Sequence, residues 1–228
     1  MHTNNEKGTK QPTIINADGL LKAIGVMGIL LPIVLVVGSM LLHSCTSILN
    51  SISEYYHSHM GNYLVGTLCA VALCMFFYNG YNKRDKQLAM FAAICALCVA
   101  FFPVPLCKDC ISSCIVTKHA LPNYFYTVHN ISAVLFFFTL AYMAYFQFTI
   151  SNAAVVTPHK ILRNRIYRIC GITIVGAIVC MGLILFVPFL SEAFQALPTT
   201  FVGEVIALWA FGIAWLTKGG FIYKDEAG

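Results

Sequence analysis

Apolar residues gather in six long blocks that are separated by short polar segments. Each block is apolar on every face and about 20 residues long, the length of helix that crosses a hydrocarbon core about 30 Å thick. Because backbone polar groups in lipid must be satisfied within the segment, we expect every block to be a helix. The predicted spans are Leu20–Leu42, Gly61–Tyr81, Leu88–Leu106, Tyr124–Ile150, Ile166–Leu190 and Thr200–Thr217.

These blocks predict an all-α, polytopic transmembrane helix bundle that forms a single domain. Residues 20–217 make up the six-span membrane domain, residues 1–19 a flexible cytoplasmic tail and residues 218–228 a second cytoplasmic tail. The first block is too long for the apolar region of a secretory signal, so we expect an uncleaved first helix. Composition agrees, since 59% of the residues are hydrophobic and 10% are charged, against roughly 25% charged in soluble domains.

The distribution of basic residues predicts the orientation. All but Lys108 and Lys118 of the 14 lysines and arginines lie in the two tails or in the second and fourth loops. Lysine and arginine favour short cytoplasmic loops, so both termini are predicted to be cytoplasmic, in a bacterial plasma (inner) membrane. The net charge of +5 then reflects topology and contact with anionic lipid, and nucleic acid is not an expected partner.

Two basic segments have alternative interpretations. Arg163, Arg165 and Arg168 precede or begin the fifth span, where they would anchor the helix or bind an anionic lipid headgroup. Asp85 lies among the basic residues of the second loop. We expect it to be a solvated turn residue.

Four of the ten cysteines are predicted to lie on or near the outer face: Cys45, Cys107, Cys110 and Cys114. An oxidising compartment would favour disulfides among them, with a pairing that the sequence leaves open. An alternative is a metal site formed by the last three with His119. The other six cysteines fall inside spans, where a free cysteine packs as a small apolar residue.

The outer loop Thr46–Met60 has an amphipathic pattern at 100° per residue, which predicts a helix along the outer surface. The apolar arc contains Ile48, Leu49, Ile52, Tyr55, Tyr56, His59 and Met60. His59 is therefore expected to face the bundle or the lipid and, with Tyr55 and Tyr56, to be a candidate for ligand binding. Glu54 and His57 share the polar arc and could contact each other.

Charged or ionisable groups within spans are rare here, and such groups mark a functional site by default. His129 and Glu204 each lie about six residues inside the outer end of a span, roughly 9 Å deep. Their matching depth makes a contact between them possible. We expect an outward-opening polar pocket containing Glu54, His57 or His59, His129 and Glu204. The alternative is a structural pair that joins two helices.

No cofactor is predicted. Zn²⁺ held by His57, His59 and His129 with a carboxylate is an alternative, although no H-E-x-x-H pattern is present. Haem between His129 and one of the two loop histidines is another.

The leading functional prediction is a pocket that engages a lipid or another amphiphile, with membrane lipids as partners. If the protein is an enzyme, lipid hydrolysis or acyl transfer is the expected class. His129 or His57 would be the base, Glu54 or Glu204 its partner and Ser51 the nucleophile. A non-enzymatic scaffold, as a homo-oligomer or a subunit of a membrane complex, is a second hypothesis. A transporter is a third, which predicts polar residues through the full depth of the bilayer, whereas the inner halves of the spans are apolar.

Several short motifs resemble a known group. Ser51-Ile52-Ser53-Glu54 follows the first span, Phe102-Pro103 ends the third, and His129 precedes Phe136-Phe137-Phe138 in the fourth. This layout resembles bacterial multi-span membrane proteins of unknown function and is similar to the DRAM-like six-span proteins, which include autophagy modulators and lipid-remodelling factors of GPI anchors. The resemblance implies a six-helix bundle with an outer-face site and a link to lipids. Where the DRAM-like proteins have a proline-containing loop, this chain has Glu54-Tyr55-Tyr56-His57.

Overall fold

Each of the six predicted spans contains a long helix in the computed structural model, which describes residues 17–43, 45–105, 115–116, 121–151 and 157–222. The long helices are α1 (Ala17–His43), α2 (Gly61–Phe76), α3 (Lys83–Phe101), α4 (Asn123–Tyr142), α5 (Pro158–Phe186) and α7 (Thr199–Lys218). Four segments, α1, α4 with its extension to Gln147, α5 and α7, are long and apolar enough to cross a membrane. Helix α2 is apolar but shorter, at 16 residues.

Three features of the helices differ from the sequence prediction. Helix α5 begins at Pro158, eight residues before the predicted Ile166. Thr157 caps it by accepting a hydrogen bond from Lys160 N at 3.2 Å, and proline at the first helical position is preorganised for a helix. A short helix, α6 (Pro188–Phe194), precedes α7, and a π-helical turn, η2 (Met143–Gln147), extends α4.

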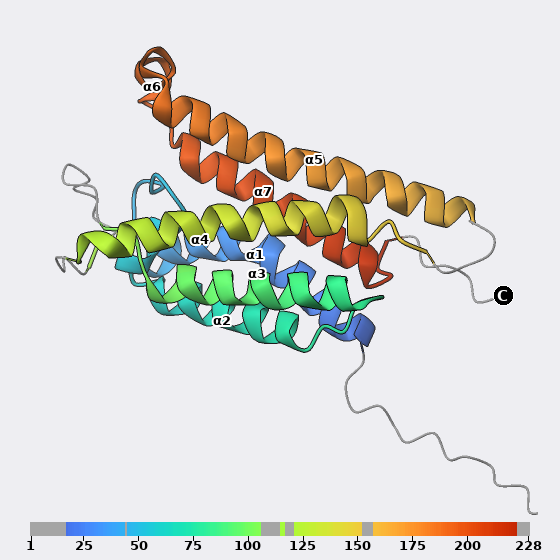
Figure 1. Cartoon of the computed structure of the whole chain (residues 1–228). Helices are drawn as coiled ribbons and strands as arrows, with labels where there is room; N and C mark the ends of the chain where they lie inside the picture. The colour runs from blue at the N-terminus through green and yellow to red at the C-terminus, as the bar shows by residue number, and fades with distance from the viewer. Residues whose placement is uncertain (1–16, 44, 106–114, 117–120, 152–156, 223–228) are drawn as a thin grey trace, which may run out of the picture.

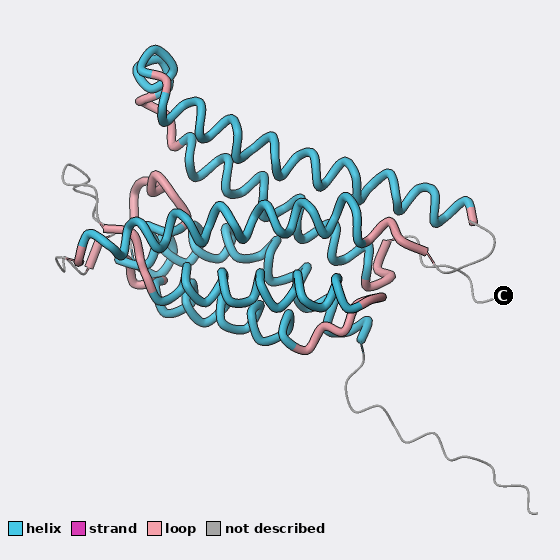
Figure 2. The backbone as a smooth tube through the Cα atoms, in the orientation of Figure 1, coloured by secondary structure: helices cyan, strands magenta, loops and turns pink. Residues whose placement is uncertain are grey.

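The six long helices form a closed ring. Each packs on the next one along the chain, α5 packs on α7, and α7 closes the ring against α1. Figure 1 shows α2 beside α3 and α5 beside α7, and the latter pair diverges from the other helices toward α6. Figure 2 shows that the connections lie at the two ends of this bundle. The centre of the ring is therefore bounded mainly by α1, α2, α3, α4 and α7.

Glycines allow α1 and α7 to approach closely where they close the ring. A Cβ atom on Gly212 would lie 2.7 Å from the Gly25 carbonyl oxygen, and a Cβ on Gly25 would lie 2.7 Å from the Gly212 carbonyl oxygen. Only a residue without a side chain fits at such a backbone contact, as in the small-residue interfaces of membrane helices. Nearby, the Trp209 indole N–H donates to the Ile29 carbonyl oxygen at 3.2 Å.

The predicted basic segments meet at one end of the bundle, here called the basic end. Gly219, just after α7, approaches Asp18 and Lys22 at the start of α1. Lys218 lies over the Tyr81 ring, 3.9 Å from its centroid. The opposite end, which carries residues 45–60, is here called the loop end.

Asp85 corrects one sequence expectation, because it is fully buried at the basic end and not a solvated turn residue. Its Oδ2 accepts hydrogen bonds from the Tyr78 hydroxyl at 2.8 Å and from Tyr81 N at 3.1 Å. Asn82 caps α3 by accepting from Asp85 N at 2.8 Å. The carboxylate thus holds the turn between α2 and α3 from inside, and Gly80 fits against it with φ +47°.

Candidate functional site

The loop before α2 closes the loop end of the ring, and it does so without the predicted α-helix. Its regular part is the 3₁₀-helix η1 (Ser53–His57). Of the buried apolar residues of the loop, Leu49 and Ile52 precede η1 and Tyr55 lies within it. The loop is also joined to α7, because the Asn50 carbonyl oxygen accepts from Phe201 N at 2.8 Å.

The two histidines of this segment lie in different environments. His57, predicted on the polar face, is 1% exposed. Its Nε2 donates to the Val104 carbonyl oxygen at 2.7 Å, while Nδ1 has no hydrogen-bond partner among the described residues. His59, predicted to face the bundle or the lipid, lies after η1 and is exposed. Of the two tyrosines proposed to bind a ligand, Tyr55 is buried and Tyr56 is exposed.

Ser51 and Glu54 have a local structural role that resembles a capping box. The Ser51 hydroxyl accepts from Glu54 N at 3.2 Å, and the Glu54 carboxylate accepts from Asn50 N at 3.0 Å. The S-x-x-E pattern is a known signal for this arrangement at the start of a helix. Burial raises the pKa of Glu54, and the hydrogen bond from Asn50 N partly opposes that increase.

His129 binds Ser53, not the predicted nucleophile Ser51. Its Nε2 lies 2.9 Å from Ser53 Oγ, and its Nδ1 lies 2.8 Å from the Phe102 carbonyl oxygen. The imidazole is 4% exposed and joins α4, the end of α3 and the loop. The sequence contains the whole motif Ser51-Ile52-Ser53-Glu54, but only the fold distinguishes the serine that meets the histidine from the one that caps η1.

Glu204 also binds the loop, and the predicted pair with His129 does not form. Its Oε2 accepts from Ile52 N at 2.5 Å. His129 and Glu204 therefore bond to consecutive residues, Ser53 and Ile52, and the loop lies between them. Both groups belong to the loop end as expected, but each is satisfied by the loop and not by the other. The two side chains do not pair because the loop, whose position the hydrophobic pattern does not predict, lies between them.

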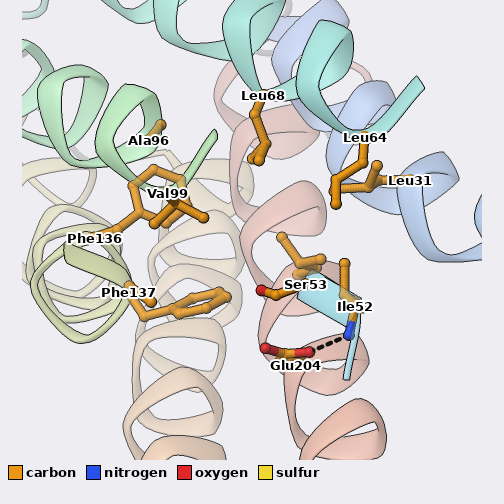
Figure 3. Close-up of a pocket in the computed structure, with 12 residues that line it drawn as sticks. Leu31, Ile52, Ser53, Leu64, Leu68, Ala96, Val99, Phe136, Phe137 and Glu204 are labelled. Carbon is orange, nitrogen blue, oxygen red and sulfur yellow. Dashed lines mark hydrogen bonds between the residues drawn. The ribbon is translucent and has the colours of Figure 1, made fainter. Parts of the chain in front are cut away.

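A cavity of about 40 Å³ lies inside the ring at this point. Ser53 and Glu204 contribute its polar groups, and Figure 3 shows them together with Ile52 on one side of the cavity. Apolar side chains from α1, α2, α3, α4 and α7 supply the rest of the wall: Leu31, Leu64, Leu68, Ala96, Val99, Ala133, Phe136, Phe137 and Leu208. A smaller cavity, also lined by Ser53, has His129, Tyr56 and Pro103 in its wall.

The described residues contain no group of three or more histidine, cysteine or acidic side chains that could hold a metal ion. His57, His59 and His129, the weak candidates for zinc, have separate environments: two bind different backbone carbonyls and one is exposed. Cys45 is disulfide-bonded. The other predicted disulfide candidates, Cys107, Cys110 and Cys114, lie outside the described residues, as does His119.

The arginines proposed to contact lipid headgroups differ in exposure at the basic end. Arg165 and Arg168 are exposed, whereas Arg163 is half-buried. Arg168 lies over the Tyr145 ring, 5.9 Å from its centroid, a distance at which a cation and an aromatic face attract each other. Lys160, in the same segment, is buried and donates to the carbonyl oxygens of Phe148 and Ile150 at 3.1 and 3.2 Å.

The loop end thus brings together a serine hydroxyl and a carboxyl group at the wall of an otherwise apolar cavity, and an imidazole that bonds to the serine and lines the smaller cavity. The hydroxyl and imidazole can exchange a proton, the carboxyl group can accept hydrogen bonds from a polar ligand, and the apolar wall can hold hydrocarbon. Comparisons with protein-family models, with curated proteins and with solved structures give no match for this chain.

Proposed function

We propose that this is a six-span membrane protein whose loop-end cavity binds the apolar chain of a lipid or a similar amphiphile. The cavity is the observation that carries the proposal. It is enclosed by leucine, valine, alanine and phenylalanine side chains, and its polar groups are confined to one side. Apolar cavities of this kind exclude water and take up apolar molecules.

The proposed topology has both termini in the cytoplasm and the loop end on the outer side. Two observations support it: the start of α1 and the end of α7 meet at the same end of the bundle, and that end collects basic residues, which favour the cytoplasmic side. The cavity then lies at the depth of the outer leaflet. The same orientation leaves Arg165 and Arg168 exposed beside the anionic inner leaflet.

Glu204 restricts the chemistry of the proposed ligand. One of its carboxyl oxygens already accepts a hydrogen bond from Ile52 N, and the carboxyl group forms part of the cavity wall. A ligand that carries its own carboxylate or phosphate would bring a charge into a medium of low dielectric constant, and no basic side chain among the described residues lines the cavity to pair with it. We therefore expect an amphiphile with a neutral, hydrogen-bonding group next to its chain, such as an ester or a hydroxyl.

Photo-crosslinking of the purified protein in lipid nanodiscs tests this proposal. The probe is a monoacylglycerol with a diazirine in its acyl chain, and mass spectrometry locates the cross-links. We expect labelling of Phe136, Phe137 or Leu208. Ala133→Trp fills the cavity and should lower labelling about tenfold, a loss of about 1.4 kcal/mol of binding free energy. Val134→Trp, on the exposed face of the same helix, is the matched control and should leave labelling unchanged.

A second probe, a fatty acid carrying the same diazirine, tests the expected preference for a neutral polar group. The neutral probe should label the wild-type protein more strongly, because no basic side chain in the described part of the chain lines the cavity to pair with the carboxylate of the fatty acid. Equal labelling of the Ala133→Trp and Val134→Trp variants, both folded as judged by thermal melting, would refute binding in the cavity.

A further inference from the structure

Ser53 and His129 have the hydrogen-bond arrangement of a serine nucleophile and its general base. A carbonyl oxygen can only accept, so the contact at 2.8 Å with Phe102 requires that Nδ1 of His129 carries the proton. In the neutral imidazole, Nε2 then holds a lone pair. The Ser53 hydroxyl, 2.9 Å away, donates its proton to that lone pair. The backbone carbonyl of Phe102 thus selects the tautomer that a base needs, the role that a buried carboxylate has in Ser-His-Asp triads.

Ser53 differs in this respect from two other serines of the same loop. Ser51 accepts a hydrogen bond from Glu54 N, and the Ser58 hydroxyl donates to the Tyr55 carbonyl oxygen at 2.7 Å. Both therefore stabilise the backbone locally. Ser53 bonds to a side-chain base and also lines both cavities of the loop end, so its oxygen is next to the space in which the proposed ligand would lie.

We propose that Ser53 is an acyl-accepting nucleophile, with His129 as its base, that cleaves neutral carboxylic esters of long-chain lipids. This inference rests on the proposed function, because the cavity would position the acyl chain. Ser53 Oγ would attack the ester carbonyl carbon while its proton moves to His129 Nε2. The bond to the alcohol oxygen then breaks, and His129 returns the proton to the departing alcohol. Water, activated by the same imidazole, attacks the acyl-serine and releases the carboxylic acid, so that ester and water give acid and alcohol.

The arrangement also predicts a slow reaction. The Phe102 carbonyl fixes the tautomer of His129, but unlike a carboxylate it brings no negative charge to stabilise the imidazolium formed during attack. Reaction with a reagent that phosphonylates a nucleophilic serine irreversibly is therefore a more sensitive test than turnover of an ester. The arrangement further predicts that reactivity depends on Ser53 and His129 but not on Ser51, although Ser51 lies only two residues away.

The test uses an alkyl fluorophosphonate with a long chain, applied to the full-length protein in nanodiscs, with the modified residue located by mass spectrometry. We expect modification of Ser53, its loss in Ser53→Ala, and wild-type modification in Ser51→Ala. His129→Gln should slow the reaction by about 100-fold or more, the usual effect of removing a general base. A thermal melt of each variant shows whether it is folded.

Because His129→Gln could disturb the fold, a pair of cysteine variants provides a second measurement. His129 should accelerate alkylation of the thiol in Ser53→Cys relative to the thiol in Ser51→Cys, measured at each site by mass spectrometry. Equal alkylation rates, or modification by the fluorophosphonate that survives Ser53→Ala, would overturn the assignment. Photo-crosslinking without reaction at Ser53 would refute the nucleophile and leave the binding proposal standing. Absence of both would refute both.

Discussion

Replacing Asp85 with alanine should destabilise the protein by about 3 kcal/mol, although the residue lies among lysines and arginines in a short connection. The Tyr78 hydroxyl would lose the carboxylate oxygen to which it donates a hydrogen bond at 2.8 Å. Tyr78 is 6% exposed, so its hydroxyl is buried. A buried donor left without an acceptor costs about 1–3 kcal/mol, and we assign about 2 kcal/mol to it. Tyr81 N, in a residue that is 52% exposed, can bind water instead and should contribute about 1 kcal/mol.

The measurement is unfolding in detergent micelles, followed with a thiol-reactive dye that reports exposure of the free cysteines of the helices. A loss of about 3 kcal/mol corresponds to a fall in melting temperature of about 6–12 °C for a protein of this size. The matched control is Lys83→Ala, at an exposed position in the same turn of α3. Its melting temperature should lie within about 1–2 °C of that of the wild type, because surface substitutions of this kind change stability by about 0.5 kcal/mol or less.

A double-mutant cycle makes the reasoning refutable. In Tyr78→Phe the ring and its edge-to-face contact with Trp215, at 5.2 Å between centroids, remain, but the hydroxyl is gone. Asp85→Ala should therefore cost less in the Tyr78→Phe background, by about 1–2 kcal/mol, because no buried hydroxyl is left without an acceptor. If the two substitutions are additive within about 0.5 kcal/mol, or if Asp85→Ala melts like the wild type, the carboxylate does not hold this turn.

Two further predictions concern the ring and the loop. Gly212→Ala should destabilise the protein by about 1–3 kcal/mol in the same unfolding assay, because the added Cβ would clash with the Gly25 carbonyl oxygen. The control is Gly176→Ala, where nothing lies within 4 Å, and it should be neutral or stabilising by up to about 1 kcal/mol. An equal loss of stability in both variants would refute the close contact. Glu54→Gln should have the same melting temperature as the wild type near pH 4 and a higher one at neutral pH. The pKa of Glu54 is raised in the folded protein, so the wild type loses stability as the pH rises past the pKa of Glu54 in the unfolded chain. A melting difference that does not vary with pH would contradict this.

The helices of this protein can be predicted from the sequence because each one is marked by a long, unbroken block of apolar residues. Blocks of about 20 apolar residues specify helices in lipid whatever their neighbours are. Thr157-Pro158 also indicates the start of α5, because threonine is a common N-cap residue and proline is common at the first helical position. The apolar pattern alone predicts a later start, because the residues that follow Pro158 include several basic ones.

The site could be predicted only in part, for reasons that lie in the loop. His129 and Glu204 were expected at one end of the bundle, and that is where they lie, but their partners are Ser53 and the backbone of Ile52. The α-helical repeat predicts His57 on the polar face, but the residue is buried, because only five residues of this segment are helical and they form a 3₁₀-helix. Asp85 was misjudged for a different reason: its partner Tyr78 lies across a turn, and its neighbours in the sequence are all basic.

The contact between α1 and α7 has a consequence for how the protein is made. Helices are inserted in chain order, yet α1 packs Gly25 against Gly212 of α7, and the Asn50 carbonyl oxygen accepts from Phe201 N in the first turn of α7. The ribosome must therefore synthesise the chain through α7 before α1 can bury its glycine face. Until then α1 lacks the helix against which it mainly packs. A chain truncated before α7 should therefore be recognised by membrane quality control.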